Sequence, residues 1–174
     1  MENLNLFEQS LAQSPSATPS HDKTTFVREV SVTYRGARRA TTMIRKAQDI
    51  ADFIRKILPD NSREHFVALY LDAAHKVIAF YVVSTGTIRH TLVHPREVFQ
   101  SAIHVGAAAI AVGHNHPSGS TRPSPEDTVV TKTLDAAGEL LGVRLLDHVI
   151  VTEDSFFSYT ENGAFRKRAA GTHR

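Results

Sequence analysis

The sequence predicts an α+β domain in which a mixed β-sheet is flanked by helices. Two observations support this fold class. Apolar segments that alternate or run unbroken, as strands do, are interspersed with segments whose apolar residues recur every three or four positions, as in helices. The chain of 174 residues is also long enough for one domain with a buried core, and its 41% hydrophobic and 22% charged residues are ordinary for a soluble globular protein.

Composition excludes several classes of protein and of site. The chain has no cysteine, so it forms no disulfides and no thiolate metal site, and any metal ion must be held by nitrogen and oxygen atoms. No apolar run is long enough to cross a bilayer, and the first residues lack the features of a signal peptide. We therefore expect a cytoplasmic protein without membrane contact.

Positive charge is weak overall but is clustered in two places. The formal net charge of +2 argues against a dedicated nucleic-acid-binding protein, which usually carries a denser basic surface. Arg35, Arg38 and Arg39 form one cluster, and residues 166–174 form a basic C-terminal tail. We interpret both clusters as solvated surface, with a weak association with nucleic acid as the alternative.

The first part of the chain predicts a tail, a strand and a helix. Residues 1–24 are rich in Ser, Thr, Gln and Pro and indicate a disordered tail, so we place the folded domain at residues 25–165. Residues 26–34 largely alternate apolar and polar side chains, which predicts a half-buried strand. Apolar residues at helical spacing then predict a helix over 44–58, which the following proline ends.

The middle of the chain predicts most of the sheet. Residues 65–71 are nearly all apolar and indicate a buried strand, and residues 77–84 return as its hairpin partner. Residues 87–93 predict a third strand. A helix is expected to begin at Pro95 and to end at Gly106.

The last part of the chain contains the residues that carry chemistry. An apolar run over 107–116 ends in two histidines, and a helix is expected over 125–141. Residues 143–159 predict one strand with a hairpin to another.

His114 and His116 stand two apart at the end of the apolar run. On a strand such residues share one face, about 6–7 Å apart, so their imidazoles can converge on one ion. Asp127 is the third candidate ligand, at the third position of a helix that begins with Ser124 as its N-cap. The alternative is that Asp127 only caps the helix, although a capping box prefers the longer Glu or Gln at this position.

Two histidines and one aspartate fill three positions of a tetrahedral zinc site and leave the fourth for water, which is typical of a catalytic site. Zinc lowers the pKa of such a water to about 7 and polarises a carbonyl. Hydrolysis also requires a proton shuttle that is not a ligand. The hydroxyl of Ser124 is a candidate donor to the oxyanion that forms.

The pattern HNHP at 114–117, followed by Ser124 and Asp127, resembles the JAMM motif of the MPN/JAB metallopeptidases. Together with HPREVF at 94–99 and LLDH at 145–148, it resembles the RadC family in particular. The resemblance implies a JAB-type fold, a curved mixed sheet flanked by helices, with zinc held by the two histidines and the aspartate. It also implies cleavage of amide or isopeptide bonds, including those of ubiquitin-like tags. Larger RadC members carry an N-terminal helix-hairpin-helix segment, which we do not expect here.

The resemblance further implies a catalytic glutamate on an early strand, next to an apolar run. Glu64 matches best, and it would share a face with Phe66 if the strand already begins at Glu64. Glu97 is the alternative, but an acid in the first turn of a helix has a structural explanation.

The other histidines are less informative. His148 lies in an apolar strand, where we expect a buried histidine with satisfied hydrogen bonds, with a role beside the metal as the alternative. His90, His94 and His104 are interpreted as surface or structural residues.

The leading functional hypothesis is a zinc-dependent metallopeptidase that acts on an unidentified peptide or protein. One alternative is a nucleic-acid-processing or DNA-repair protein of the RadC kind. The string His-Asn-His does not indicate an HNH nuclease, whose three residues are spread over a ββα unit. Another alternative is a JAB module without catalysis. The same ligands would also accept iron, manganese or cobalt.

Overall fold

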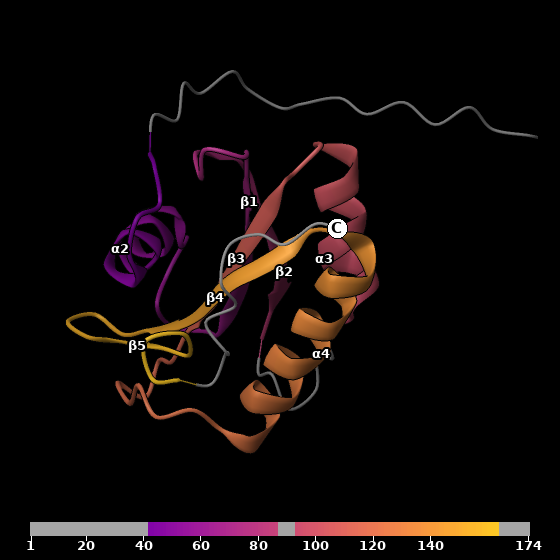
Figure 1. Ribbon diagram of the computed structural model, residues 1–174. Helices are drawn as coiled ribbons and strands as arrows, with labels where there is room; N and C mark the ends of the chain where they lie inside the picture. The colour runs from indigo at the N-terminus through magenta and orange to yellow at the C-terminus, as the bar shows by residue number, and fades with distance from the viewer. Residues whose placement is uncertain (1–41, 87–92, 164–174) are drawn as a thin grey trace, which may run out of the picture. The chain divides into compact units, whose positions relative to one another are not determined.

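The computed structural model describes residues 42–86 and 93–163, and these contain a mixed five-stranded sheet (Figure 1). The strand order is β2-β1-β3-β4-β5. The strands are β1 (His65–Leu71), β2 (Val77–Thr85), β3 (Ala109–Asn115), β4 (Arg144–Val151) and β5 (Phe156–Ser158). Only β3 and β4 are parallel, and the other neighbours pair antiparallel.

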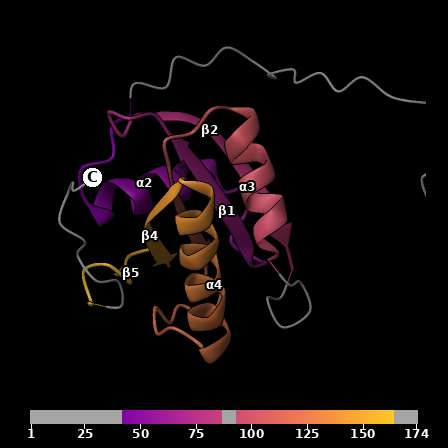
Figure 2. The ribbon, with the colours of Figure 1, turned by 45° about the vertical axis from the view of Figure 1, so that its right-hand side comes forward.

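Three helices cover the two faces of the sheet. They are α2 (Ala47–Ile57), α3 (Pro95–His104) and α4 (Pro125–Leu141). One apolar core joins α2 to one face, and a second core joins α3 and α4 to the other. Figures 1 and 2 show the same division, with α2 on one side of the sheet and α3 and α4 on the other. The predicted α+β class, a mixed sheet flanked by helices, is confirmed.

Strand β1 shows how the two faces are separated. Every residue of β1 is buried, because neighbouring strands flank it and helices cover both its faces. Val67 and Leu69 enter the core under α2, whereas Phe66 and Ala68 enter the core under α3 and α4. Alternate side chains of β1 therefore pack against different helices.

Most predicted elements within the described residues are present. The strand over 65–71 and the helix over 125–141 have the expected bounds. The hairpin partner of β1 extends to Thr85, and the segment 143–159 divides into β4 and β5. The predicted tails and the predicted strand over 26–34 lie outside the described residues, and so does the predicted strand over 87–93 apart from Val93.

The start of α2 differs from the prediction. The apolar period predicted a helix from Ile44, but the helix begins at Ala47. The residues before it are bonded to the turn between β1 and β2 instead: Ile44 N–H donates to the carbonyl of His75 at 2.9 Å, and Val77 N–H donates to that of Thr42 at 3.0 Å. Backbone pairing with a distant segment thus delays the helix.

Strand β4 contains a β-bulge that sequence periodicity did not predict. Leu145 pairs with Ile110 and His148 pairs with Val112, so β4 advances three residues where β3 advances two. Leu145 and His148 are three residues apart, so in a regular strand they would face opposite sides of the sheet. With the extra residue of the bulge, both face α4, because a bulge re-aims the side chains that follow it.

Asp147 stabilises this bulge. Its carboxylate accepts the N–H of His148 at 2.8 Å, the hydroxyl of Ser158 at 2.6 Å and the N–H of Thr160 at 3.0 Å. Burial raises the pKa of Asp147, against the effect of these bonds.

None of the helices in the described ranges has the length and apolar character that a bilayer crossing requires.

Replacing Asp147 with alanine should destabilise the fold. The substitution leaves three donors without their acceptor in a buried region, so we expect the free energy of unfolding to fall by about 1–3 kcal/mol. Urea denaturation of the purified chain measures this. Asp154→Ala, at an exposed position in the turn between β4 and β5, is the control and should leave stability unchanged. Equal stability of both variants would contradict this role of Asp147.

Candidate metal centre

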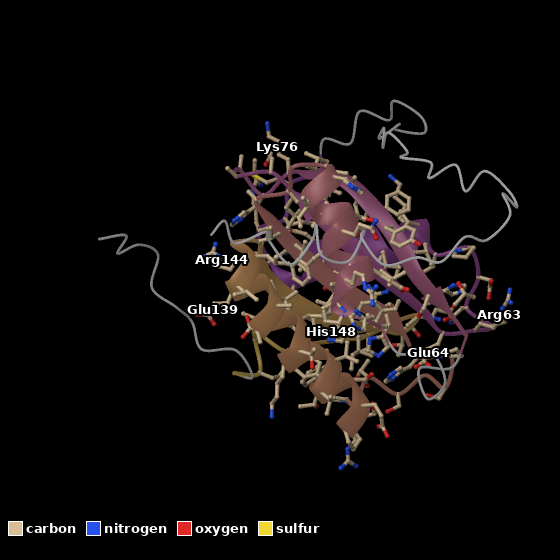
Figure 3. The ribbon with its side chains drawn as sticks, turned by 90° about the vertical axis from the view of Figure 1, so that its right-hand side faces the viewer. Arg63, Glu64, Lys76, Glu139, Arg144 and His148 are labelled. Atoms are coloured by element: carbon tan, nitrogen blue, oxygen red, sulfur yellow. The ribbon has the colours of Figure 1, made fainter. Side chains whose placement is uncertain are left out.

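Four potential donor side chains meet where β1 begins and β3 ends. His114 lies on β3, and His116 follows the strand on the same face, which is the face covered by α3 and α4. Phe66 pairs with His114, which places Glu64, two residues earlier, beside His116. Asp127 reaches the same place from the first turn of α4. Figure 3 shows Glu64 at the entry to β1 and His148 on β4 in the same region of the sheet.

The distances between donor atoms suit a single ion. The Nε2 atoms of His114 and His116 are 2.9 Å apart. Asp127 places Oδ1 3.2 Å from Nε2 of His114 and Oδ2 3.6 Å from Nε2 of His116. In a tetrahedral site with zinc–ligand bonds of about 2.0 Å, neighbouring donor atoms are about 3.3 Å apart. The donor set of imidazole and carboxylate therefore fits zinc in both chemistry and spacing.

Glu64 is a fourth potential donor. Its Oε1 lies 3.6 Å from Nε2 of His116, and one donor atom from each of Glu64, His114 and His116 fits within 4.8 Å of the others. The chain thus contains a possible metal-binding group, and two carboxylates compete for a place in it. Asp127 is almost fully buried, whereas the side chain of Glu64 is 18% exposed. That difference leaves Glu64 closer to solvent than Asp127.

A hydrogen bond to the backbone defines which nitrogen of His116 carries a hydrogen. Its Nδ1 lies 2.7 Å from the carbonyl oxygen of Ser120. A carbonyl can only accept, so Nδ1 carries the hydrogen, and in a neutral ring the lone pair of Nε2 faces the other donors. A hydrogen bond with Asp127 raises the pKa of His116, against the opposing effect of burial. A proton therefore competes with a cation for Nε2 of His116 more strongly than it would at an ordinary histidine.

Asp127 both caps α4 and faces the histidines. Its Oδ2 accepts the N–H of Ser124 at 2.8 Å, while the hydroxyl of Ser124 accepts the N–H of Asp127 at 3.0 Å. This is a complete capping box, formed by an aspartate at a position where the longer Glu or Gln is preferred. The other carboxylate oxygen remains directed at His114. Capping and ligation are thus compatible in one side chain.

The charge of Asp127 is fixed by the same contacts. Burial alone would raise the pKa of Asp127, but hydrogen bonds with His114 and His116 outweigh burial and hold it well below its usual range. The carboxylate is therefore ionised at any pH at which the protein would bind a metal ion.

Ser124, predicted as an oxyanion donor, lies at the N-cap of α4 beside Asp127. Its oxygen accepts the N–H of Asp127, and a hydroxyl that accepts one bond still has its proton to donate. The structure thus places Ser124 at the edge of the donor cluster, where it is both a cap and a potential donor.

Glu97, His94 and His104 lie elsewhere. Glu97 is exposed in the first turn of α3. His94 caps that helix by accepting the N–H of Arg96, and His104 is exposed in its last turn. His90 lies outside the described residues.

Asn115, between the two histidines, was missed by sequence reasoning. Its side chain is buried and accepts the N–H of His65 at 2.8 Å while donating to the carbonyl of Arg63, also at 2.8 Å. These two bonds hold the backbone on both sides of Glu64. The only sequence signal is its place beside the histidines on the strand's opposite face.

His148 lies directly behind His114. It is fully buried, and its Nε2 is 2.9 Å from Nδ1 of His114. Burial lowers the pKa of His148 well below its ordinary value, so the ring is neutral. The residue is thus both a satisfied buried histidine and a neighbour of the candidate ligand, and the two interpretations made from sequence do not exclude each other.

Comparison with known proteins identifies the relatives of this chain. A family model described as the RadC-like JAB domain matches residues 44–164. A UPF0758 protein of Chlorobaculum parvum is 40% identical over 128 residues, which are 74% of this chain and 58% of the relative. A UPF0758 protein of Shouchella clausii is 42% identical over 135 residues, 75% of this chain and 59% of the relative. The chain thus spans less than two thirds of the length of these curated relatives.

Zinc affinity should fall as the pH is lowered. Because Asp127 raises the pKa of His116, protons compete with zinc up to a higher pH than at an ordinary histidine. We expect the Kd for zinc to rise as the pH falls, beginning at a higher pH than for a ligand with the ordinary pKa of histidine. Competition with a fluorescent chelator at a series of pH values measures the Kd. A constant Kd would contradict the proposed ligand role of His116.

Proposed function

This chain belongs to the RadC-like JAB domain family, and from that premise we propose that it is a zinc-dependent hydrolase of amide or isopeptide bonds. The observation that carries the proposal is the convergence of two imidazole Nε2 atoms, 2.9 Å apart, with the carboxylates of Asp127 and Glu64. The substrate proposed is a peptide or a protein of the cytoplasm.

We assign three residues as zinc ligands: His114, His116 and Asp127. Both oxygens of Asp127 are near the histidines, and its backbone is fixed by the first turn of α4. A zinc ion bound there lowers the pKa of water and polarises a carbonyl group. This ligand set leaves a coordination position for chemistry, which distinguishes a catalytic site from a structural one.

Glu64 is assigned as the proton shuttle. Its carboxylate is 3.6 Å from Nε2 of His116 and is partly exposed, so it can contact both a water molecule bound to the ion and a substrate that approaches from solvent. In this role Glu64 takes a proton from the attacking water and delivers it to the leaving amine. Asn115 supports the role by holding the backbone on both sides of Glu64.

Ser124 is assigned as the donor to the oxyanion. Its oxygen is held by the N–H of Asp127, which fixes the position of the hydroxyl beside the ligand carboxylate. A donor fixed before the reaction stabilises developing negative charge without reorganisation.

Metal content tests the ligand assignment. The purified chain should contain about one zinc per molecule after loading, and His116→Ala should lose it, because two remaining ligands hold the ion poorly. Elemental analysis after dialysis measures this. His104→Ala, which removes an exposed histidine of α3, is the control and should retain full occupancy. Absence of zinc from the unmodified chain would favour a JAB module without catalysis.

Turnover tests the role of Glu64. Glu64→Gln keeps the shape of the side chain but removes its basicity, so zinc should remain bound while turnover falls by about 10²–10⁴-fold. A panel of peptides and ubiquitin-like fusions, with and without chelator, provides the assay. Glu97→Gln is the matched control and should behave like the unmodified chain. Unchanged turnover in Glu64→Gln would remove this residue from the mechanism.

A further inference from the structure

A line of buried hydrogen bonds runs behind the candidate metal centre, on the side away from its donor atoms. Nδ1 of His114 is 2.9 Å from Nε2 of His148. Nδ1 of His148 is 2.6 Å from the hydroxyl of Thr131 on α4. That hydroxyl is in turn 2.6 Å from the backbone carbonyl of Asp127. The line therefore begins at one proposed ligand and ends at another.

The direction of every bond in this line follows from its last acceptor. The carbonyl of Asp127 can only accept, so the single hydroxyl proton of Thr131 is donated to it. The oxygen of Thr131 then accepts from Nδ1–H of His148, and Nε2 of a neutral His148 is left without hydrogen. This bare nitrogen accepts from Nδ1–H of His114. In a neutral ring, the Nε2 of His114 is thereby left with its lone pair, as metal ligation requires.

We propose that His148 and Thr131 are positioning residues that set the tautomer and orientation of His114 and tie that ligand to Asp127. The proposal rests on the metal centre proposed above. It assigns these residues no contact with substrate. Their effect is exerted through His114, whose ring is already arranged for an ion before one arrives, and through the backbone of Asp127.

Packing fixes the ring of His148 in this role. Tyr159 stacks on it with ring centroids 5.1 Å apart and an angle of 14° between planes. Phe66 meets it edge to face at 5.4 Å, and Phe66 also stacks on His114. The bulge in β4 turns the ring toward α4. With His148 fully buried among these contacts, the ring is held in the orientation that gives Nε2 to His114.

The bond from Thr131 to the carbonyl four residues earlier is not unusual by itself. Thr133 on the same helix makes the same bond, to the carbonyl of Val129 at 2.8 Å, at an exposed position. Thr131 differs in that its hydroxyl oxygen also accepts a hydrogen bond from Nδ1–H of His148. Thr133 therefore provides a control that makes the same bond to the helix backbone, at an exposed position and without the histidine.

The first experiment compares zinc affinities. Thr131→Val removes the hydroxyl with little change of shape, and it should weaken zinc binding by roughly 10–100-fold, the usual effect of losing a partner of a metal-bound histidine. Thr131→Ser keeps the hydroxyl and should bind like the unmodified chain, as should Thr133→Val. Competition with a chelator measures each Kd. Equal affinities of Thr131→Val and Thr133→Val would overturn the proposal.

The second experiment separates the two nitrogens of His148. In His148→Gln the side-chain amide reaches the place of Nε2 and can still accept from His114, whereas in His148→Asn it reaches only the place of Nδ1. We expect zinc affinity in the order unmodified chain, Gln variant, Asn variant. Equal losses in both variants would overturn the proposal, and because glutamine also leaves a smaller cavity than asparagine, the imidazole tautomers are needed to separate this role from packing.

The third experiment reads the tautomers in the zinc-free full chain. Nitrogen-15 NMR of the imidazoles should show hydrogen on Nδ1 of His114 and on Nδ1 of His148, and Thr131→Val should abolish the single tautomer of His148. Hydrogen on Nε2 of His148 would overturn the proposal. This readout needs neither zinc nor a substrate. A chain that shows the expected tautomers but binds no zinc would contradict the proposed function and would support the role of His148 and Thr131 in setting the tautomer of His114.

Discussion

The pairing of β3 with β1 on one side and with β4 on the other is the constraint on which the site depends. Because Phe66 pairs with His114 in antiparallel strands, the residue two before Phe66 and the residue two after His114 meet on one face of the sheet. Glu64 and His116 owe their proximity to this register. A shift of one residue would turn both histidines toward α2 and its apolar core, where their nitrogens would lack polar partners.

The first turn of α4 joins the sheet to the site through a single side chain. Asp127 satisfies the helix end with one oxygen and approaches His114 with the other, and the nearby imidazoles keep it charged despite its burial. Local helix stability and ion binding are therefore linked, because loosening the cap also moves a donor. This arrangement explains why a short aspartate serves at a position where a capping box alone would favour glutamate.

Much of the fold followed from sequence because it depends on local patterns. The apolar run over 65–71 and the cap of α4 each carry their own signal, and the spacing of His114 and His116 needs only strand parity. The start of α2 was misplaced because the residues before it pair with a distant turn. Asn115 and Thr131 were missed because their importance lies in contacts with segments far along the chain. No local pattern records such contacts.

The bulge in β4 limits what a motif search can establish about related chains. The spacing from the histidines to Asp127 says nothing about strand β4, which lies further along the chain. A relative whose β4 kept the same residues but paired regularly with β3 would keep every letter of the HxHP and SxxD pattern, yet the histidine that corresponds to His148 would face α2. Alignments of this family therefore need to count residues in β4 as well as match ligands, because a histidine three residues after the leucine needs a bulge to face α4, whereas one only two residues after it would not.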